Sequence, residues 1–354
     1  MPRTGDKLGD LDPRRAEVLR AIVRRHIATG EPVGSRTVAE GTRLDLSPAS
    51  IRALMAELEE SGLLLQPHPS AGRVPTVVAY RIYVEQLLVR RPRVAAAQAE
   101  SIDRALTASG GEIPDLLGEA SRQLSHLSQH VGLVLAPDLQ RIIVEQIEFI
   151  RLSDRRVLTI LVDRSGVVRQ RSLQLDAVPT QDELERIGRY LSDDFRGQTL
   201  PHIRAEVQRR LSAERAAYDR LRLQSLELAS RAMAPGGDEA DLFVDGISNL
   251  LESPDLADRD MIRSLFKTLE EKETMVGLLS RLLDGDGVQV VIGDENPLSD
   301  LACCSLIASN YGVGDRVMGT VGIVGPTRMR YPRAIALVDY LASAISRLLL
   351  DHGN

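Results

Sequence analysis

The chain has 354 residues, 43% hydrophobic and 27% charged, which predicts a globular protein of two or three domains. No apolar run approaches the ~20 residues that cross a bilayer, and the first residues lack the apolar core of a secretory signal. We therefore expect a cytoplasmic protein without membrane contact. The net charge of −6 argues against a uniformly basic nucleic-acid binder, but residues 1–90 hold 13 basic and 11 acidic residues, against 31 and 39 in the remainder.

The first predicted helix begins at Asp12-Pro13, because aspartate accepts a hydrogen bond at a helix N-terminus and proline fits the first turn. Its apolar stripe consists of Val18, Leu19, Ile22, Val23 and Ile27. The glycine and proline of Thr29-Gly30-Glu31-Pro32 end this helix. We expect Ser35 to cap a short second helix that carries Val38 and Ala39 and ends near Gly41.

A third helix is predicted from Ser47-Pro48 to Gly62, with a buried stripe of Ile51, Leu54, Met55 and Leu58. The opposite face is small, carries one guanidinium and has no acid in its first two turns; it consists of Ala49, Ser50, Arg52, Ala53 and Ala56. The acids collect at the far end of the helix. A helix that enters the major groove with its N-terminus first needs this layout, because DNA phosphates repel acids at the point of entry.

The next segment predicts a two-stranded ribbon, with strands at 63–66 and 74–76 around a rigid loop, Pro67 to Arg73. Three helices and a ribbon make a winged helix-turn-helix, whose wing presents His68, Ser70, the Gly72 backbone and Arg73 to phosphate or the minor groove. Winged helices also serve as protein-contact modules, so the pattern alone leaves that alternative open. A further helix through Tyr80 and Leu87 leads out of the domain.

The rest of the chain predicts one sheet domain interrupted by an inserted helical subdomain. Residues 92–98 and Gly110-Gly111 indicate a linker, and residues 181–283 are almost wholly helical in pattern, with a long helix through Leu211 and Met233 that breaks at Pro235-Gly236-Gly237. Helices are predicted at 113–129 and 335–348, and strands at 131–135, 141–150, 157–162, 167–175, 288–292, 303–309 and 317–324. The pattern does not decide whether the inserted helices form a dimer or pack on their own sheet.

No catalytic, cofactor or metal site is predicted. The series Gly319, Gly322 and Gly325 lacks the lysine of a phosphate-binding loop, and the adjacent Cys303 and Cys304 fit no zinc or disulfide spacing, so we expect two buried free thiols. The acid pairs at 193–194 and 284/286 are expected in solvated turns. A regulator that binds a small effector in its sheet domain is the alternative function, and an enzyme that uses the glycine series is a third.

Five ordered stretches closely resemble the HrcA family of bacterial heat-shock repressors: GEPVGSR (30–36), LSPASIR (46–52), PHPSAGRVPT (67–76), GDEN (293–296) and VGIVGPTRMRY (321–331). The resemblance spans about residues 12 to 350. It implies an α+β protein with a winged helix-turn-helix at 1–90, a GAF-like domain at 91–185 and 273–354, and an inserted dimerising domain at 186–272. It further implies a homodimeric, non-enzymatic repressor of chaperone operons that binds an inverted-repeat operator, needs no cofactor and depends on the chaperonin GroEL.

We expect the DNA contacts to come from the second helix, the third helix and the wing: Ser35, Arg36, Thr37, Ser47, Ala49, Ser50, Arg52, Ala53, His68, Ser70, Gly72 and Arg73. The chain departs from the family pattern, which usually has threonine where Ser50 and Pro69 stand and asparagine where Ala53 stands. Asparagine is a good reader of adenine. Its loss at position 53 leaves the base preference of this helix open.

Overall fold

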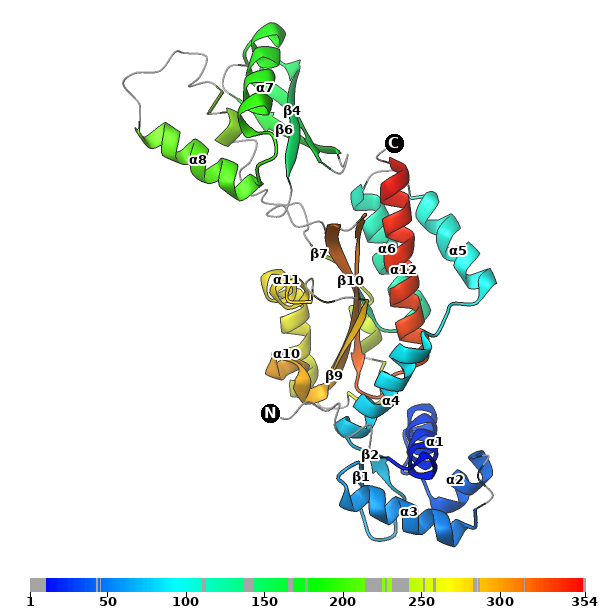
Figure 1. Cartoon of the computed structure of the whole chain (residues 1–354). Coiled ribbons are helices and arrows are strands. Elements are labelled where there is room, and N and C mark those ends of the chain that lie inside the picture. The colour runs from blue at the N-terminus through cyan, green and yellow to red at the C-terminus, as the bar shows by residue number, and fades with distance from the viewer. Residues whose placement is uncertain are drawn as a thin grey trace. The chain divides into compact units, whose positions relative to one another are not determined.

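A computed structural model (Figure 1) describes residues 11–42, 44, 46–109, 113–136, 143–164, 168–175, 178–213, 225–226, 228–230, 242–250, 252–256, 259–282, 285, 287–314 and 316–352. The protein is α+β and divides into two compact units. The first unit holds Met1–Val134, Leu242–Asn310 and Thr320–Ser343; the second holds Leu135–Asp241, Tyr311–Gly319 and Ala344–Asn354. None of the helices in these ranges is both long and apolar enough to span a membrane.

Residues 11–90, here called the head, form the predicted winged helix-turn-helix. It consists of α1 (Pro13–Thr29), α2 (Ser35–Gly41), α3 (Pro48–Glu60), β1 (Leu64–Leu65), β2 (Val74–Pro75) and α4 (Val77–Arg90). Its core contains most of the apolar stripes predicted for α1 and α3, joined by Val38 and Leu64, whereas the predicted Ile27 and Leu54 are only partly buried. Strands β1 and β2 pair antiparallel, with Leu65 opposite Val74.

The helix ends of the head are set by local chemistry, and two predicted caps are wrong. Gly30 ends α1 in the left-handed conformation (φ 78°), and the Ser47 side chain caps α3, as predicted. Asp12 stands at the N-cap of α1 without a side-chain hydrogen bond. Ser35 is the first residue of α2, behind an N-cap at Gly34. A favoured residue type therefore located these helix starts to within one residue, but did not establish the capping bond.

The first unit also contains most of a five-stranded sheet in the order β7 (Leu242–Asp245), β3 (Val131–Leu135), β10 (Arg316–Pro326), β9 (Cys304–Val313), β8 (Val288–Ile292). In Figure 1, α6 (Ile113–Ser128) and α12 (Tyr331–His352) lie on one side of this sheet, and α10 (Arg259–Glu270) and α11 (Lys272–Ser280) on the other. Every residue of β3 is buried, as expected for a strand covered on both faces. The short helices η3 (Ile247–Leu250), η4 (Gly293–Glu295) and η5 (Ser299–Leu301) connect these elements.

Three expectations for this unit are wrong. Strand β7 lies in the stretch predicted to be helical; its four residues give too short a pattern to reveal a strand. Residues 96–98, predicted as linker, begin the helix α5 (Ala96–Thr107), which packs on α6. Cys304 is buried as expected, but Cys303 is partly exposed. The predicted glycine hinge at 110–111 lies outside the described residues.

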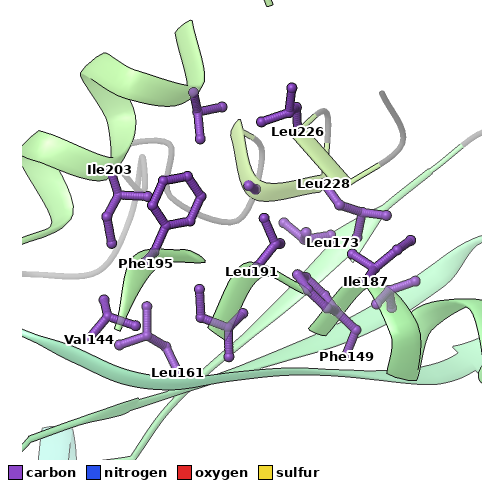
Figure 2. Close-up of a cluster of buried hydrophobic side chains, with 14 of the residues drawn as sticks. Val144, Phe149, Leu161, Leu173, Ile187, Leu191, Phe195, Ile203, Leu226 and Leu228 are labelled. Carbon is purple, nitrogen blue, oxygen red and sulfur yellow. The ribbon is translucent and has the colours of Figure 1, made fainter. Parts of the chain in front are cut away.

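The second unit is built on an antiparallel three-stranded sheet, β4 (Val144–Ser153), β5 (Arg156–Asp163) and β6 (Val168–Gln174), with the helices α7 (Gln181–Phe195) and α8 (Leu200–Ala213). Alternate residues of the strands point towards α7, with Ile147 opposite Leu161 and Val157 opposite Leu173. Figure 2 shows Phe149 and Leu173 from the strands packed with Ile187 and Leu191 of α7. This cluster gives the second unit a hydrophobic core of its own.

The division of the chain differs from the predicted boundaries. Strands 144–174 were expected in the GAF-like domain and the inserted domain was expected to span 186–272. These strands instead share a unit with α7 and α8, and α10 belongs to the first unit. Alternation identifies a strand without identifying its sheet, and the short connections here let three consecutive strands pair with one another. The predicted long helix through Tyr218, Leu221 and Met233, and its break at 235–237, lie outside the described residues.

Candidate nucleic-acid interface

The N-terminal half of α3 presents an open face. The Ser47 hydroxyl oxygen accepts the backbone N–H of Ser50 (3.1 Å), which satisfies one of the free amides of the first turn. While Ile51, Met55 and Leu58 are fully buried, the side chains on the other side are exposed: Ser47, Ala49, Ser50, Arg52 and Ala53. The buried stripe therefore holds the helix on the core with its small, polar face towards solvent.

The charges around this face favour an anion. Neither α2 nor α3 carries an acid in its first turn, so the positive ends of both helix dipoles are uncompensated by acidic side chains there. Two acids at the far end of α3 have basic partners: Glu57 pairs with Arg15 (2.6 Å) and Glu59 with Arg73 (2.8 Å). A phosphate that approaches the start of α3 thus meets little opposing charge.

Two arginines next to this face are available to a ligand. Arg52 on α3 and Arg36 on α2 are exposed, and within the described part of the chain their guanidinium groups make no ion pair or hydrogen bond. Ser35 and Thr37, the other predicted contacts on α2, are partly exposed. The fork of an exposed arginine can donate two hydrogen bonds to a guanine edge or to a phosphate.

The wing presents His68 and Ser70 at its exposed tip. Gln66, which the sequence analysis did not single out, holds this loop: its Nε2 donates to the carbonyl oxygens of Pro69 (2.9 Å) and Ala71 (3.0 Å). A glutamine at the entry of a loop rich in proline is a weak signal, because its partners are carbonyl groups that the sequence does not distinguish. The wing tip is thus fixed from inside, and its side chains are free.

Gly72 and Arg73 anchor the wing to the turn between α1 and α2. A Cβ atom at Gly72 would lie 2.4 Å from the carbonyl carbon of Val33, so only glycine fits. The N–H of Arg73 donates to the Val33 oxygen (2.9 Å), and the N–H of Val33 donates to the Arg73 oxygen (2.8 Å). The Arg73 side chain is only 16% exposed, and its Nε donates to Glu59 (2.9 Å). The guanidinium predicted to face DNA thus has a partner within the head.

A second exposed surface lies on the three-stranded sheet, on the face away from α7. Here aliphatic side chains alternate with the buried ones, and Leu152 and Val168 are 51% and 48% exposed. Across the strands, Ile150 lies opposite Leu158 and Val162 opposite Val168. We call this the outer face: Ile150, Leu152, Leu158, Ile160, Val162 and Val168. Exposed aliphatic clusters of this kind are typical of protein contacts.

The edge of the same sheet is closed by side chains of α7. The Ser192 hydroxyl accepts the N–H of Ile147 (2.9 Å) and donates to its carbonyl oxygen (3.2 Å), while the Gln181 Oε1 accepts the N–H of Arg151 (3.0 Å). A groove of about 450 Å³, lined by both polar and apolar side chains, runs between β4 and α7. Backbone groups of an edge strand that already have partners do not pair readily with another strand.

Comparison with known proteins places this architecture among the non-enzymatic transcription regulators. The family model "HrcA protein C terminal domain" matches residues 114–335. The heat-inducible transcription repressor HrcA of Geobacter sulfurreducens is 42% identical over 340 residues, which is 96% of this chain and 98% of that protein. The HrcA protein of Xanthomonas axonopodis pv. citri is 39% identical and covers 97% of both chains. The chain therefore belongs to the HrcA family of heat-inducible transcription repressors.

A solved structure has the same fold. It is described as a hypothetical protein at 2.2 Å resolution, superposes with a TM-score of 0.65, and covers 97% of this chain and 100% of its own at 24% identity. The fold class expected from the sequence, an α+β protein with an N-terminal winged helix, is confirmed. The resemblance carried by five short motifs extends over nearly the whole chain.

Proposed function

We propose that the chain represses chaperone operons from the cytoplasm as a homodimer, and that each protomer places α3 in the major groove of one half of an inverted-repeat operator. The observation that carries this proposal is the exposed face at the start of α3, with Arg52 as its one charged group and no acid in the first turn. Family membership supports repression as the outcome of binding.

In this arrangement Arg52 donates to a base edge, and the starts of α2 and α3 approach the phosphates. The wing lies along the backbone or the minor groove. Gly72 and Arg73 contribute through their backbone and by fixing the wing, because the Arg73 guanidinium is bound to Glu59. The other proposed contacts are Ser35, Arg36, Thr37, Ser47, Ala49, Ser50, Ala53, His68 and Ser70.

A footprint on the chaperone promoters of the source organism tests this proposal. We expect protection of both halves of an inverted repeat, and we expect loss of that protection in an Arg36→Ala/Arg52→Ala double variant that remains folded. Protection only at unrelated promoters would retain DNA binding but refute the assignment to chaperone operons. Full protection by the double variant would place the interface on another surface.

The outer face is the proposed dimer interface, with a second copy of the chain as its partner. A two-fold operator needs two heads related by a two-fold axis, and such an interface uses the same patch on both chains. An aliphatic face can pack against a second copy of itself. The β4 edge is less suited to pairing with a second copy, because Ser192 and Gln181 already bind its backbone groups. Two copies of the face would bury side chains such as Leu152 and Val168, which are otherwise about half exposed.

Ile160→Lys tests this interface, because Ile160 lies on the central strand and a lysine there would place an unpaired charge in the contact. Sedimentation should show a monomer that still binds a single half-site but binds the full operator weakly. Val89→Lys is the matched control, since Val89 is an exposed aliphatic residue on α4, far from this sheet in the chain. Dimers that persist in Ile160→Lys would move the interface elsewhere.

Dependence on GroEL is proposed from family membership. Several domains and a sheet whose strands come from distant parts of the chain favour slow, aggregation-prone folding. The chaperonin then raises the folded fraction and leaves the affinity of each folded dimer unchanged. Titration with operator DNA separates these effects: GroEL with ATP should move the stoichiometric breakpoint while the dissociation constant stays fixed. A fixed breakpoint with rising affinity would indicate an allosteric partner instead.

A further inference from the structure

Helix α4 is part of the head on one side. The Nε and Nη2 atoms of Arg20 on α1 donate to the Gln86 Oε1 on α4 (3.1 and 2.9 Å). Helix α4 also packs on α1 and β2 of the head, whereas Tyr80 on the same helix contacts Tyr331 of α12 (ring centroids 6.0 Å apart). Motion of α4 therefore moves the head as a whole.

The other side of α4 is bound to the sheet domain through Arg81. Its Nε donates to the Glu295 Oε1 (2.8 Å), its Nη2 donates to the Val290 carbonyl oxygen (2.7 Å), and a further contact joins it to the second Glu295 oxygen. That oxygen also accepts the N–H of Ile292 (2.8 Å), which fixes the carboxylate in place. The Arg81 side chain is 14% exposed. The Glu295 side chain is 34% exposed, so solvent and salt reach this ion pair from one side and screen it in part.

Arg328 makes a second, separate connection, to the C-terminal end of α1. Its Nη1 donates to the Ile27 carbonyl oxygen (3.2 Å), and its Nε donates to Asp255 (2.8 Å). A Cβ atom at Gly30 would lie 3.1 Å from the guanidinium carbon, so the guanidinium packs against the glycine that ends α1. A cation at this end of a helix is favoured by the helix dipole and by the free carbonyl groups.

Both connections are held by the two C-terminal family motifs. In GDEN, the Asn296 Nδ2 donates to the carbonyl oxygens of Gly293, Leu301 and Cys304 (2.8, 3.1 and 2.9 Å), which fixes the loop that carries Glu295. In the second motif, the Thr327 hydroxyl donates to the Cys303 oxygen (3.0 Å), one residue before Arg328. The two motifs thus hold Glu295 and Arg328, the sheet-domain residues that contact the head, in place.

We propose that Arg81 and Arg328 are positioning residues that lock the head in one orientation on the sheet domain, and so restrict the separations that the two DNA-reading helices of the dimer can reach. Contact through α4 alone would leave rotation about that helix; the bond from Arg328 to the end of α1 removes it. The α3 face remains exposed in this locked arrangement, so the lock is compatible with DNA binding. The operator consequences rest on the proposed function.

The lock affects binding through the second half-site. Once one head is bound, the other meets its half-site at an effective concentration set by the link between them, and a fixed orientation raises that concentration only at the matching spacing. A released head reaches several spacings, each with a lower effective concentration. Affinity at the native spacing therefore falls, discrimination between spacings falls with it, and binding to an isolated half-site is unchanged.

The first test needs no DNA. Spin labels on Ser70→Cys and Glu270→Cys, both exposed residues of the first unit, report the head-to-sheet distance by pulsed electron paramagnetic resonance, in a background with both native cysteines replaced. An excess of unlabelled chain keeps one labelled protomer per dimer. We expect a narrow distance distribution that broadens clearly in Arg81→Ala/Arg328→Ala. Arg122→Ala, which removes an i,i+3 ion pair on α6, is the control and should stay narrow. A narrow distribution in the double variant would refute the lock.

The second test measures affinity for the native operator, for an operator with the half-sites moved apart, and for one half-site. The double variant should lose about tenfold at the native spacing, keep the half-site affinity, and discriminate less between spacings. Glu295→Gln, which keeps an oxygen for the Ile292 amide, should shift the profile in the same direction. Tighter binding by the double variant, or an unchanged spacing profile, would refute the proposal. If wild-type protein shows the narrow distance distribution but binds no operator, the lock stands and the proposed function fails.

Discussion

Replacing Arg52 with alanine separates DNA reading from folding more clearly than any other change in the head. The side chain is exposed, and within the described part of the chain it makes no ion pair or hydrogen bond. Truncation should therefore change the free energy of unfolding by no more than about 0.5 kcal/mol. A bidentate arginine–guanine contact is worth about 1–3 kcal/mol, so operator affinity should fall by about 5- to 150-fold.

Arg73→Ala provides the comparison, because its guanidinium is bound inside the head. Removal of this side chain leaves Glu59 without its partner at 2.8 Å, and since both side chains keep some contact with water the loss of stability should be about 1 kcal/mol. The charge of Arg73 is already balanced by Glu59. The dependence of affinity on salt should therefore keep its slope, whereas loss of one phosphate contact would lower it by about 0.9.

Fluorescence anisotropy of a labelled operator duplex, repeated over a series of salt concentrations, measures both quantities, and urea unfolding measures stability. Unchanged affinity in a folded Arg52→Ala variant would remove Arg52 from the interface and refute the argument from its exposure. A salt slope that falls by about one in Arg73→Ala would show that its guanidinium leaves Glu59 for a phosphate on binding. That result would return Arg73 to the role expected from the sequence.

Three further predictions concern ionisation and packing. Burial lowers the pKa of His130 from 6.5 to about 4, so as the pH falls the unfolded chain protonates this imidazole before the folded chain does. The free energy of unfolding should therefore fall by up to about 3 kcal/mol between pH 6.5 and pH 4. Urea unfolding over this pH range should show the decrease, and a His130→Asn variant should lack it. A hydrogen bond from the adjacent thiol lowers the pKa of Cys303 to about 7, while the contact with Cys303 and burial raise the pKa of Cys304. Iodoacetamide at neutral pH should therefore alkylate Cys303 before Cys304. Equal alkylation rates of the two thiols, measured by peptide mass spectrometry, would contradict this. Gly72→Ala places a methyl group 2.4 Å from the backbone of the α1–α2 turn and should cost about 1–3 kcal/mol, whereas Gly41→Ala, with nothing within 4 Å of the new atom, should not; similar losses for both would refute the close-packing argument.

The head could be predicted from the sequence because its determinants are local. Both α1 and α3 begin with a proline in the first turn, α3 behind a capping serine, and both carry an apolar stripe at helical spacing. The exposed face of α3 follows from the same spacing, since fixing Ile51 and Met55 inside leaves Arg52 outside. No partner from a distant part of the chain is needed for this inference.

The sheets could be predicted only as strands. The strands at 144–174 were located to within three residues at each end, yet their assignment to the larger sheet was wrong, because a strand's periodicity does not identify the strand with which it pairs. Strand β7 was missed for a related reason: four residues that pair beside β3 have too little periodicity to compete with the helical pattern around them. Pairing is a property of two segments, and the pattern of one segment does not identify its partner.

The two C-terminal motifs have roles that the sequence alone does not predict. Both motifs were recognised, but the sequence predicted no structural role for Gly293. Its φ of 56° favours glycine, and a Cβ atom there would lie 3.0 Å from a methyl group of Val77 on α4. The partners of Glu295 and Arg328 lie 214 and 301 residues away in the chain. Local spacing therefore predicts which side chains face the DNA, whereas the orientation in which they are presented depends on contacts that only the folded chain brings together.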